Sequence, residues 1–461
     1  MDLSKLYSWL KKPILNNSIV IFRIVFALSL LIQTYYFIIE KFVEQNILKP
    51  FILFPFVDYI QPISEFYFFH WLINPMFILS IIMLTANIGM LINKIARIST
   101  FIFLCCFSYF WLLDKGYFNN HYYFISIICF LIILTNQNNP FNQNNYVPRI
   151  QLVALQAMII IIYFIAGLNK LTPYWLIDMQ PVTHILETKH NLTGHKFLIN
   201  PITISMMTYG GLIYDLCIGF LLLIRPTKIF AFLLVILFNC INYFLFRDVG
   251  EIGAFPLIMI STLTLFISPK KWGEVFKINP FNEKYFFHNP IKDLIIISFI
   301  IIQCIIPFRH LLFSGYVDYN GIGQRFSWRM KTMYKEPHTT GGIAFDVHVK
   351  KNQNKQKIAH FNLSNIEDFS NKYDMPNMYL TNKQKTALFY YPDMIPKFCS
   401  SVEKILKKRL SKEIHGDFDI IINANCKVGF MGRSPKETIN YNVDLTSTSS
   451  VDIKNWLYEL K

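Results

Sequence analysis

The sequence has little charge and lacks the patterns that mark metal or nucleic-acid binding. Only 16% of its 461 residues are charged, whereas 53% are hydrophobic. The eight cysteines form no C-x-x-C pair, and most of them lie in apolar runs, where a small buried residue is their usual role. The net charge of +15 comes without a basic stripe interleaved with aromatic residues. We therefore expect no metal site and no nucleic-acid partner.

Long runs with almost no charge indicate a protein that crosses a membrane many times. An apolar run of about 20 residues is long enough for one helix to span a bilayer. We expect no cleavable signal peptide, because Lys5, Lys11 and Lys12 lead directly into a full-length apolar segment. The predicted fold is an all-α membrane bundle of about nine transmembrane helices. The predicted spans are residues 18–39, 70–93, 97–113, 120–136, 151–170, 203–224, 229–246, 253–268 and 291–308.

Lysine and arginine are concentrated in alternate loops between these spans. With nine spans, the basic loops all fall on one side of the membrane, which the positive-inside rule assigns to the cytoplasm. Loops 114–120, 171–202 and 247–252 then lie on the opposite side, periplasmic or lumenal, together with the C-terminal tail. This multi-pass orientation also makes membrane lipids an expected partner.

The composition changes sharply after residue 308, where Lys, Asn, Asp and Ser become common. We expect residues 1–308 to form the transmembrane domain and residues 309–461 to form a small α+β domain outside the membrane. The alternating runs at 343–349 and 417–423 predict strands, and residues 389–410 predict a helix that Pro396 interrupts. Cys399 and Cys426 lie in this tail, and whether they form a disulfide stays open.

The most informative stretch is Tyr163–Trp175, at the end of an apolar run. Tyr163 and Lys170 are seven residues apart and share a helix face. Pro173 ends the helix, and Trp175 suits a membrane–water boundary. Lys170 is either a snorkelling anchor, which is the commoner role for a lysine at a helix end, or a base held partly out of water.

A second polar group, Asn119-Asn120-His121, stands at the start of the fourth span. Either asparagine can cap that helix, and His121 can be a satisfied interfacial histidine. These explanations weaken when the group shares a membrane face with Lys170, because polar side chains at that depth are costly unless they are used. We therefore interpret the two segments as one candidate site.

Five motifs follow one another along the chain: Leu112–Lys115, Asn119–His121, Tyr163–Gly167, Lys170-Leu171 and Trp175. In this order and spacing they resemble the vitamin K-dependent γ-glutamyl carboxylase family, in the transmembrane domain that bacterial members share. Shorter matches extend the resemblance over roughly residues 18 to 450. They are Phe54-Pro55, Arg97–Ser99, Gly210-Gly211, Asp215, Asn242, Ile252-Gly253, Ser327-Trp328 and Asn442–Leu445.

The resemblance implies that Lys170 is the base that deprotonates a reduced naphthoquinone, and that His121 with Asn120 stabilises the oxygenated cofactor. Asn119, Tyr163, Trp175 and Asn242 are then expected to bind the cofactor. The implied cofactor is reduced vitamin K, with O₂ and CO₂ as co-substrates and no metal. A glutamate γ-proton is far beyond any side-chain base, since each unit of pKa mismatch costs about 1.4 kcal/mol. The cofactor must therefore supply the strong base, in a dry pocket.

The sequence also departs from the family pattern. Asn169 stands where the animal enzyme has a second lysine, and Asn239 stands where the family commonly has histidine. Extra residues, including Arg247, Asp248 and Glu251, enlarge the loop before Ile252, and the tail ends soon after Leu445. Cofactor chemistry is thus expected to carry over better than recognition of a peptide or protein glutamate.

Three functions remain open from the sequence. The first is oxygenation of a lipid-soluble quinol coupled to carboxylation of glutamate or another carbon acid. The second is quinol oxidation or epoxidation that serves a different acceptor. The third is a non-catalytic membrane transport or binding protein, against which the sequence shows no paired broken helices or acidic relay.

Overall fold

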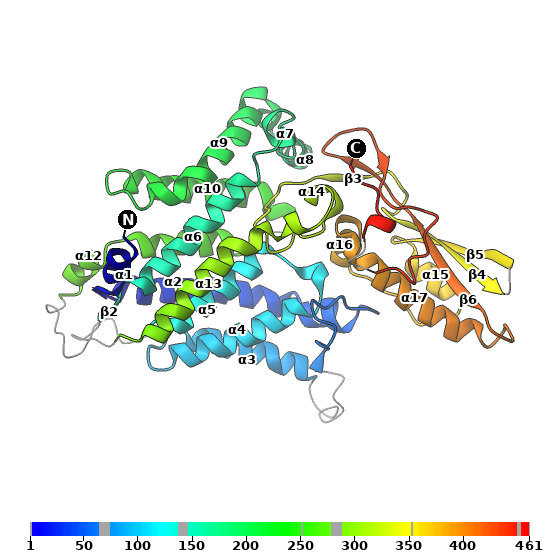
Figure 1. The fold of residues 1–461 in the computed structure, drawn as a ribbon, viewed down its shortest axis with the longest axis horizontal. Helices are drawn as coiled ribbons and strands as arrows, with labels where there is room; N and C mark the ends of the chain where they lie inside the picture. The colour runs from blue at the N-terminus through cyan, green and yellow to red at the C-terminus, as the bar shows by residue number, and fades with distance from the viewer. Residues whose placement is uncertain are drawn as a thin grey trace.

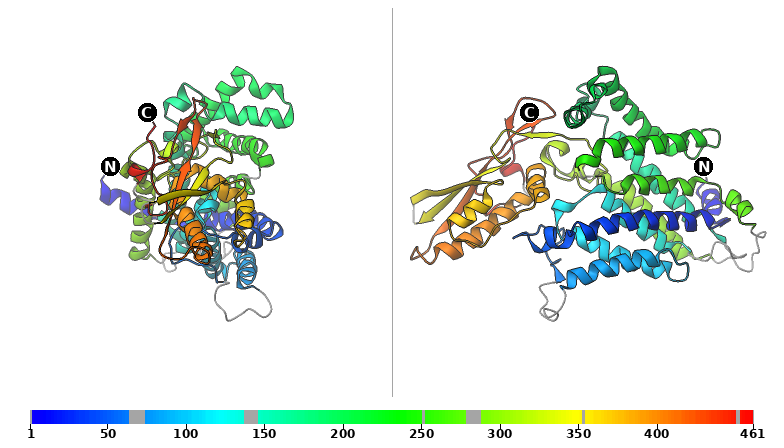
Figure 2. Two further views of the ribbon diagram at one scale, coloured as in Figure 1. Left: turned by 90° about the vertical axis from the view of Figure 1, so that its right-hand side faces the viewer. Right: turned by 180° about the vertical axis from the view of Figure 1, so that it is seen from behind.

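The computed structural model describes residues 2–63, 74–136, 146–249, 252–277, 288–351, 354–449 and 453–460. A bundle of helices is followed by a mixed tail that packs against one end of it, and the N-terminus lies at the opposite end (Figures 1 and 2). A short antiparallel pair, β1 (Pro13–Leu15) with β2 (Tyr146–Pro148), ties the N-terminal segment to the start of α6.

The bundle contains long and short helices. Its helices are α1 (Leu3–Lys11), α2 (Asn17–Ile39), α3 (Pro75–Gly89), α4 (Ala96–Leu112), α5 (Asn120–Leu134), α6 (Ile150–Leu168), α7 (Pro173–Leu176), α8 (Val182–Thr193), α9 (Pro201–Leu221), α10 (Lys228–Phe246), α11 (Phe255–Ser261), α12 (Pro269–Val275) and α13 (Pro290–Ile305).

Three of these helices begin with the same Asn-Pro pair. The side chains of Asn74, Asn200 and Asn289 each accept a hydrogen bond from a backbone N–H of the first turn. The proline that follows needs no hydrogen-bond acceptor, and its fixed φ suits the first helical position. The sequence thus specifies where α3, α9 and α13 start.

Each predicted span coincides with an apolar helix. Five helices are long and apolar enough to cross a membrane: Asn17–Ile39, Ile150–Leu168, Pro201–Leu221, Lys228–Phe246 and Pro290–Leu312. The other predicted spans fall on the shorter apolar helices Pro75–Gly89, Ala96–Leu112, Asn120–Leu134 and Phe255–Phe266. The multi-span character is therefore confirmed, whereas the count of nine crossings stays a prediction.

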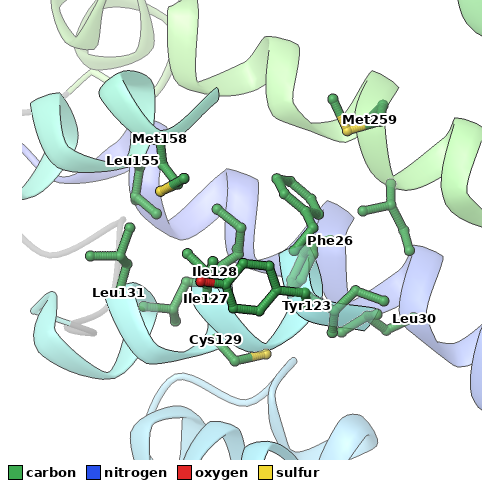
Figure 3. Close-up of a cluster of buried hydrophobic side chains, with 14 of the residues drawn as sticks. Phe26, Leu30, Tyr123, Ile127, Ile128, Cys129, Leu131, Leu155, Met158 and Met259 are labelled. Carbon is green, nitrogen blue, oxygen red and sulfur yellow. The ribbon is translucent and has the colours of Figure 1, made fainter. Parts of the chain in front are cut away.

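The bundle core lies between α2, α5, α6 and α11 (Figure 3). It is built from large aliphatic, aromatic and sulfur-containing side chains that are almost completely buried. Figure 3 labels ten of them: Phe26, Leu30, Tyr123, Ile127, Ile128, Cys129, Leu131, Leu155, Met158 and Met259. By contrast, only 28%, 17% and 22% of the apolar windows of α9, α10 and α13 are buried, as expected for helices that face lipid.

The tail has the expected α+β composition. The strands β5 (Asn354–Asn362), β4 (Ala344–Lys351) and β6 (Asp419–Asn425) form an antiparallel sheet in that order, and α15 (Ile366–Lys372) and α17 (Ile395–Leu410) lie beside it (Figure 1). A smaller sheet joins β3 (Lys335–Pro337), β7 (Lys427–Phe430) and β8 (Lys436–Glu437). The helices α14 (Val317–Asn320) and α16 (Asn382–Tyr390) complete the tail.

Two details of the tail differ from the sequence prediction. The predicted helix over 389–410 is two helices, α16 and α17, and the break is the short turn at Pro392–Met394. Pro396 does not interrupt α17 but lies in its first turn, where a proline needs no intrahelical partner. The strand β5 was not predicted, because its lysine and glutamine residues give no apolar alternation over most of its length.

Hydrogen bonds connect the tail to the loops at the end of the bundle. The side chain of Gln384 donates to the Asp114 carboxylate at 2.7 Å and to the Ile52 carbonyl at 2.9 Å. The hydroxyls of Tyr117 and Thr381 are 2.8 Å apart. Burial raises the pKa of Asp114 to about 6, against the opposing effect of the hydrogen bonds from Gln384 and from the backbone N–H groups of Gly116 and Phe54. The eight cysteines are free, and Cys399 and Cys426 are both buried in the tail.

The orientation can be tested by single cysteines placed in exposed loops. Asn191→Cys and Ser364→Cys should react with an impermeant thiol reagent added outside intact cells, because both positions are exposed and are expected to be extracytoplasmic. Lys271→Cys, on the expected cytoplasmic side, should react only after the membrane is opened. Cys399 and Cys426 are replaced by alanine in the background. Protection of position 191 or 364 in intact cells would contradict the nine-span topology.

Candidate functional site

The two polar segments expected to form a site lie at the end of the bundle that faces the tail. Asn120 begins α5 and Lys170 follows the end of α6, so both are at the same end of two antiparallel helices. Asn169 donates to the carbonyl of Ser327 at 2.8 Å, and Asn120 donates to the carbonyl of Arg329 at 3.3 Å. Because these carbonyls are two residues apart in one chain segment, they lie within about 7 Å of each other.

Lys170 is buried and forms an ion pair with Asp215 of α9. The two residues are 7% and 3% exposed, and Nζ of Lys170 donates to a carboxylate oxygen of Asp215. Such burial is not that of a snorkelling lysine, whose ammonium would extend into water. In the sequence, Asp215 stood out only as one of the short matches to the family, and nothing connected it with Lys170.

Two glycines bring α6 and α9 close enough for this pair to form. A Cβ added to Gly167 would lie 2.8 Å from the side chain of Leu216, next to Asp215. One added to Gly219 would lie 3.0 Å from the backbone of Ile160. Small residues at such crossings let two helix backbones approach closely inside a membrane.

Trp175 lies against the lysine. Thr172 caps the short helix α7, and its hydroxyl accepts from the backbone N–H of Trp175. The indole N–H of Trp175 donates to the carbonyl of Thr208 at 3.0 Å, which fixes the ring. Nζ of Lys170 lies 4.9 Å from the ring centroid, within range of a cation–π contact.

Tyr163 extends the polar cluster into the bundle. The hydroxyl of Tyr214, the residue before Asp215, donates to the Tyr163 hydroxyl at 3.4 Å. Asn239 of α10 also forms a side-chain hydrogen bond with Tyr163. Asn242 is half-buried one turn later on α10, and its expected part in cofactor binding stays a prediction.

The Asn119–His121 segment combines a helix cap with two differently held side chains. The side chain of Asn119 accepts from the backbone N–H of His121 at 2.9 Å and caps α5. The ring of His121 is stacked flat on Phe255 of α11, with centroids 3.6 Å apart and planes 9° apart. The amide oxygen of Asn120 is buried and has no hydrogen-bond partner among the described residues.

Residues 324–332, which we call the crossing segment, pass over this site between the bundle and the tail. Arg325 pairs with Asp393 at 3.0 Å, and Arg329 pairs with Asp318 at 2.8 Å. Burial raises the pKa of Asp318, although Arg329 opposes the shift. Sequence reasoning quoted Ser327-Trp328 only as a short match and assigned the crossing segment no part in the site.

The loop that the sequence indicated as enlarged makes a second ion pair, in which only the lysine is buried. Lys189 of α8 is 2% exposed and donates to Asp248, which belongs to the turn Arg247–Val249. Nζ of Lys189 also lies 4.6 Å from the ring centroid of Phe244. Glu251 of the same loop lies outside the described residues. Across the described ranges, no three His, Cys, Asp or Glu residues group as metal ligands, and the absence of a metal stays a prediction.

Comparison with known families covers nearly the whole chain. The HTTM domain model matches residues 11–272, which include α2 to α11 and the start of α12. The model of the vitamin K-dependent gamma-carboxylase lumenal domain matches residues 288–461, so it takes in α13 as well as the tail. No solved structure matches the chain. With more than half of its length in one model and most of the rest in the other, the chain belongs to the vitamin K-dependent gamma-carboxylase family.

Proposed function

We propose that this protein is a membrane enzyme that oxygenates a reduced naphthoquinone and couples this reaction to carboxylation of a carbon acid. The observation that carries the proposal is the buried Lys170–Asp215 pair beside Trp175. Family membership makes a carboxylase-like activity the first hypothesis. The acceptor that is carboxylated, and the quinone used, belong to the proposal.

The residues present fit a hydroxylated aromatic ligand. Asn120 offers a buried acceptor without a partner in the described chain, and a hydroxyl group would satisfy it. Aromatic rings from Trp175 and Phe255 lie in contact with Lys170 and His121, respectively. Lys170, His121, Asn119 and Asn120 would therefore hold the ring and its oxygens, with Tyr163 deeper in the bundle.

When bound, the reduced quinone reacts with O₂ and supplies the strong base that no side chain can provide. The protein's own task is to remove a hydroxyl proton. Lys170 can accept that proton at Nζ only as a neutral amine, and Asp215 can hold the proton that Lys170 gives up. After the transfer, the ammonium of Lys170 has the nearby carboxyl group as its partner.

His121 and Trp175 contribute through position. Stacking on Phe255 fixes the plane of the imidazole, and the bond from Trp175 to Thr208 fixes the indole. Groups that are already fixed need no reorganisation when charge develops on the ligand. Pre-organised sites stabilise the developing charge in this way. The crossing segment, held by Arg325 and Arg329, covers the site and excludes water.

A second candidate is a quinol oxidase or epoxidase with a different acceptor. It is favoured by the ion pair between Lys189 and Asp248, because Asp248 belongs to the enlarged loop at the expected mouth of the site. Asn239, at the position where the family commonly has histidine, is hydrogen-bonded to Tyr163 and to the Val235 carbonyl. Cofactor oxidation would then proceed without carboxylation of a glutamate peptide.

One assay separates the two enzyme functions from a binding or transport role. Purified protein in nanodiscs should consume O₂ when a reduced naphthoquinone is added, and ¹⁴C-bicarbonate should enter a standard glutamate peptide poorly or not at all. Arg247→Ala, outside the polar cluster, should leave O₂ uptake unchanged and alter only coupling to an acceptor. No O₂ uptake with any of several naphthoquinols would refute both enzyme functions and leave a binding or transport protein.

A further inference from the structure

Trp328 has an unusual conformation for a buried tryptophan. It is 1% exposed, and its φ of 53° is in the left-handed region that side-chain-bearing residues seldom adopt. Phe326 and Lys331 of the crossing segment also have positive φ values, of 67° and 53°. Such conformations cost of order 1 kcal/mol or more each, so they persist only where surrounding contacts enforce them, often at ligand sites.

The surrounding contacts hold Trp328 over the candidate site. The carbonyls on either side of it accept from Asn169 and Asn120, which adjoin Lys170 and His121 in sequence. Its ring stacks on Tyr123, with centroids 5.0 Å apart, and Tyr123 is one turn after Asn120 on α5. Trp328 therefore lies between the base and the Asn-Asn-His segment.

Two polar atoms of this arrangement have no partner within the described residues. They are the indole N–H of Trp328, a donor, and the amide oxygen of Asn120, an acceptor. A buried polar group without a hydrogen-bond partner destabilises the folded protein by about 1–3 kcal/mol. Such groups are therefore rare unless a ligand or a water molecule supplies the missing hydrogen bond. Asn120 is hydrogen-bonded to the residue that follows Trp328, so the donor and the acceptor belong to directly connected residues. A donor and an acceptor are what one hydroxyl group requires, because it accepts one hydrogen bond and donates another.

We propose that Trp328 and Asn120 together bind one hydroxyl oxygen of the quinol. The oxygen accepts from the indole N–H of Trp328 and donates its hydrogen to the amide oxygen of Asn120. This assignment rests on the proposed function and adds Trp328 to the binding residues. For Lys170 to take this proton, the hydroxyl turns its hydrogen from Asn120 to Nζ and the bond to Asn120 breaks. The oxygen then keeps its bond to Trp328 and gains negative charge. Hydrogen bonds to a charged acceptor are stronger, so Trp328 favours the deprotonated ligand.

An unsatisfied indole N–H alone would not justify this assignment. Trp456 is also fully buried, and its N–H also has no partner among the described residues. It lies in the apolar core of the tail, as Trp328 lies in that of the bundle, but it is absent from the residues with positive φ. Trp456→Phe is therefore the matched control, since it removes the same atom group from an equally buried ring.

The test compares ligands as well as variants. Binding of 2-methyl-1,4-naphthohydroquinone and of 2-methylnaphthalene, which lacks both oxygens, is measured by anaerobic equilibrium dialysis against protein in nanodiscs. Trp328→Phe keeps a ring to stack on Tyr123 but loses the N–H. We expect the preference for the quinol over the hydrocarbon to fall about tenfold, the factor that about 1.4 kcal/mol represents. Trp456→Phe should leave it unchanged.

If Trp328→Phe lost the same factor of affinity for both ligands, Trp328 would have a purely structural role and the proposal would be overturned. An unchanged preference for the quinol would also overturn it. Should Trp328→Phe fail to fold, Asn120→Leu tests the other half of the site. The wild type should prefer the quinol over its dimethyl ether, which cannot donate, and Asn120→Leu should lose that preference. Retention of the preference would contradict the assignment. Oxygen uptake is scored separately, so a binding result stands even if the proposed reaction fails.

Discussion

Replacing Lys170 with arginine is expected to abolish quinol-dependent oxygen uptake as completely as replacing it with alanine. Arginine stays protonated and cannot accept a proton, although it keeps the positive charge. Loss of a positioned acid–base group typically reduces a rate by about 10² to 10⁴. The measurement is O₂ consumption by each purified variant with saturating naphthoquinol.

The arginine variant is also the sharper of the two changes, because it separates catalysis from folding. A guanidinium can still pair with Asp215, so the protein should retain its thermal stability and its packing against Trp175. An active Lys170→Arg protein would mean that Lys170 serves as a structural cation, not a base. His121→Ala should lose activity to a similar degree, since nothing then stacks on Phe255 to hold a polar ring in place.

Helix positions in the bundle could be predicted closely, because they depend on local composition. The predicted fifth span at 151–170 and the observed α6 (Ile150–Leu168) differ by one or two residues. Asn-Pro pairs and long uncharged runs are visible in the sequence without any knowledge of tertiary contacts. The polar strand β5 was missed for the same reason, since its place in the sheet depends on pairing with β4.

The candidate site could be predicted only in part. Tyr163, Lys170, Trp175 and the Asn119–His121 segment were singled out, but their partners come from distant parts of the chain. Asp215 is 45 residues from Lys170, and its pairing depends on the close approach of α6 and α9 at Gly167 and Gly219. No local pattern reports such an approach.

The crossing segment was missed for a different physical reason. Ser327 and Arg329 act through their backbone carbonyls, which every residue carries, so their side chains give no signal. The left-handed φ of Trp328 is likewise imposed by its surroundings and would be predicted only for glycine or asparagine. Its position over the site became visible only in three dimensions.

Removing Asp215 is expected to destabilise the protein strongly, whereas removing the whole pair is not. Asp215→Leu leaves the buried ammonium of Lys170 without its partner, and breaking a buried pair in this way costs about 3–5 kcal/mol. The double variant Lys170→Met with Asp215→Leu buries no charge and should recover most of that loss. The measurement is the midpoint of thermal unfolding in one detergent, compared across the single and double variants.

The exposed pair Lys397–Asp58 provides the control. Its side chains are 38% and 85% exposed, so Asp58→Ala should change stability by no more than about 1 kcal/mol. If the double variant were as unstable as Asp215→Leu, the cluster would matter for packing and not for charge.

The same double variant should be inactive although it is stable, and this combination gives the cycle its value. A pair kept for stability would be replaceable by Met and Leu at no functional loss, because buried ion pairs seldom stabilise a fold more than apolar residues of similar size. A pair kept for proton transfer could not be replaced in this way without loss of activity.

Asp215→Asn refines the distinction, since asparagine still accepts a hydrogen bond from Lys170 but cannot hold its proton. We expect Asp215→Asn to be closer to the wild type than Asp215→Leu in stability but to lose oxygen uptake, and full activity in Asp215→Asn would limit Asp215 to orienting the lysine.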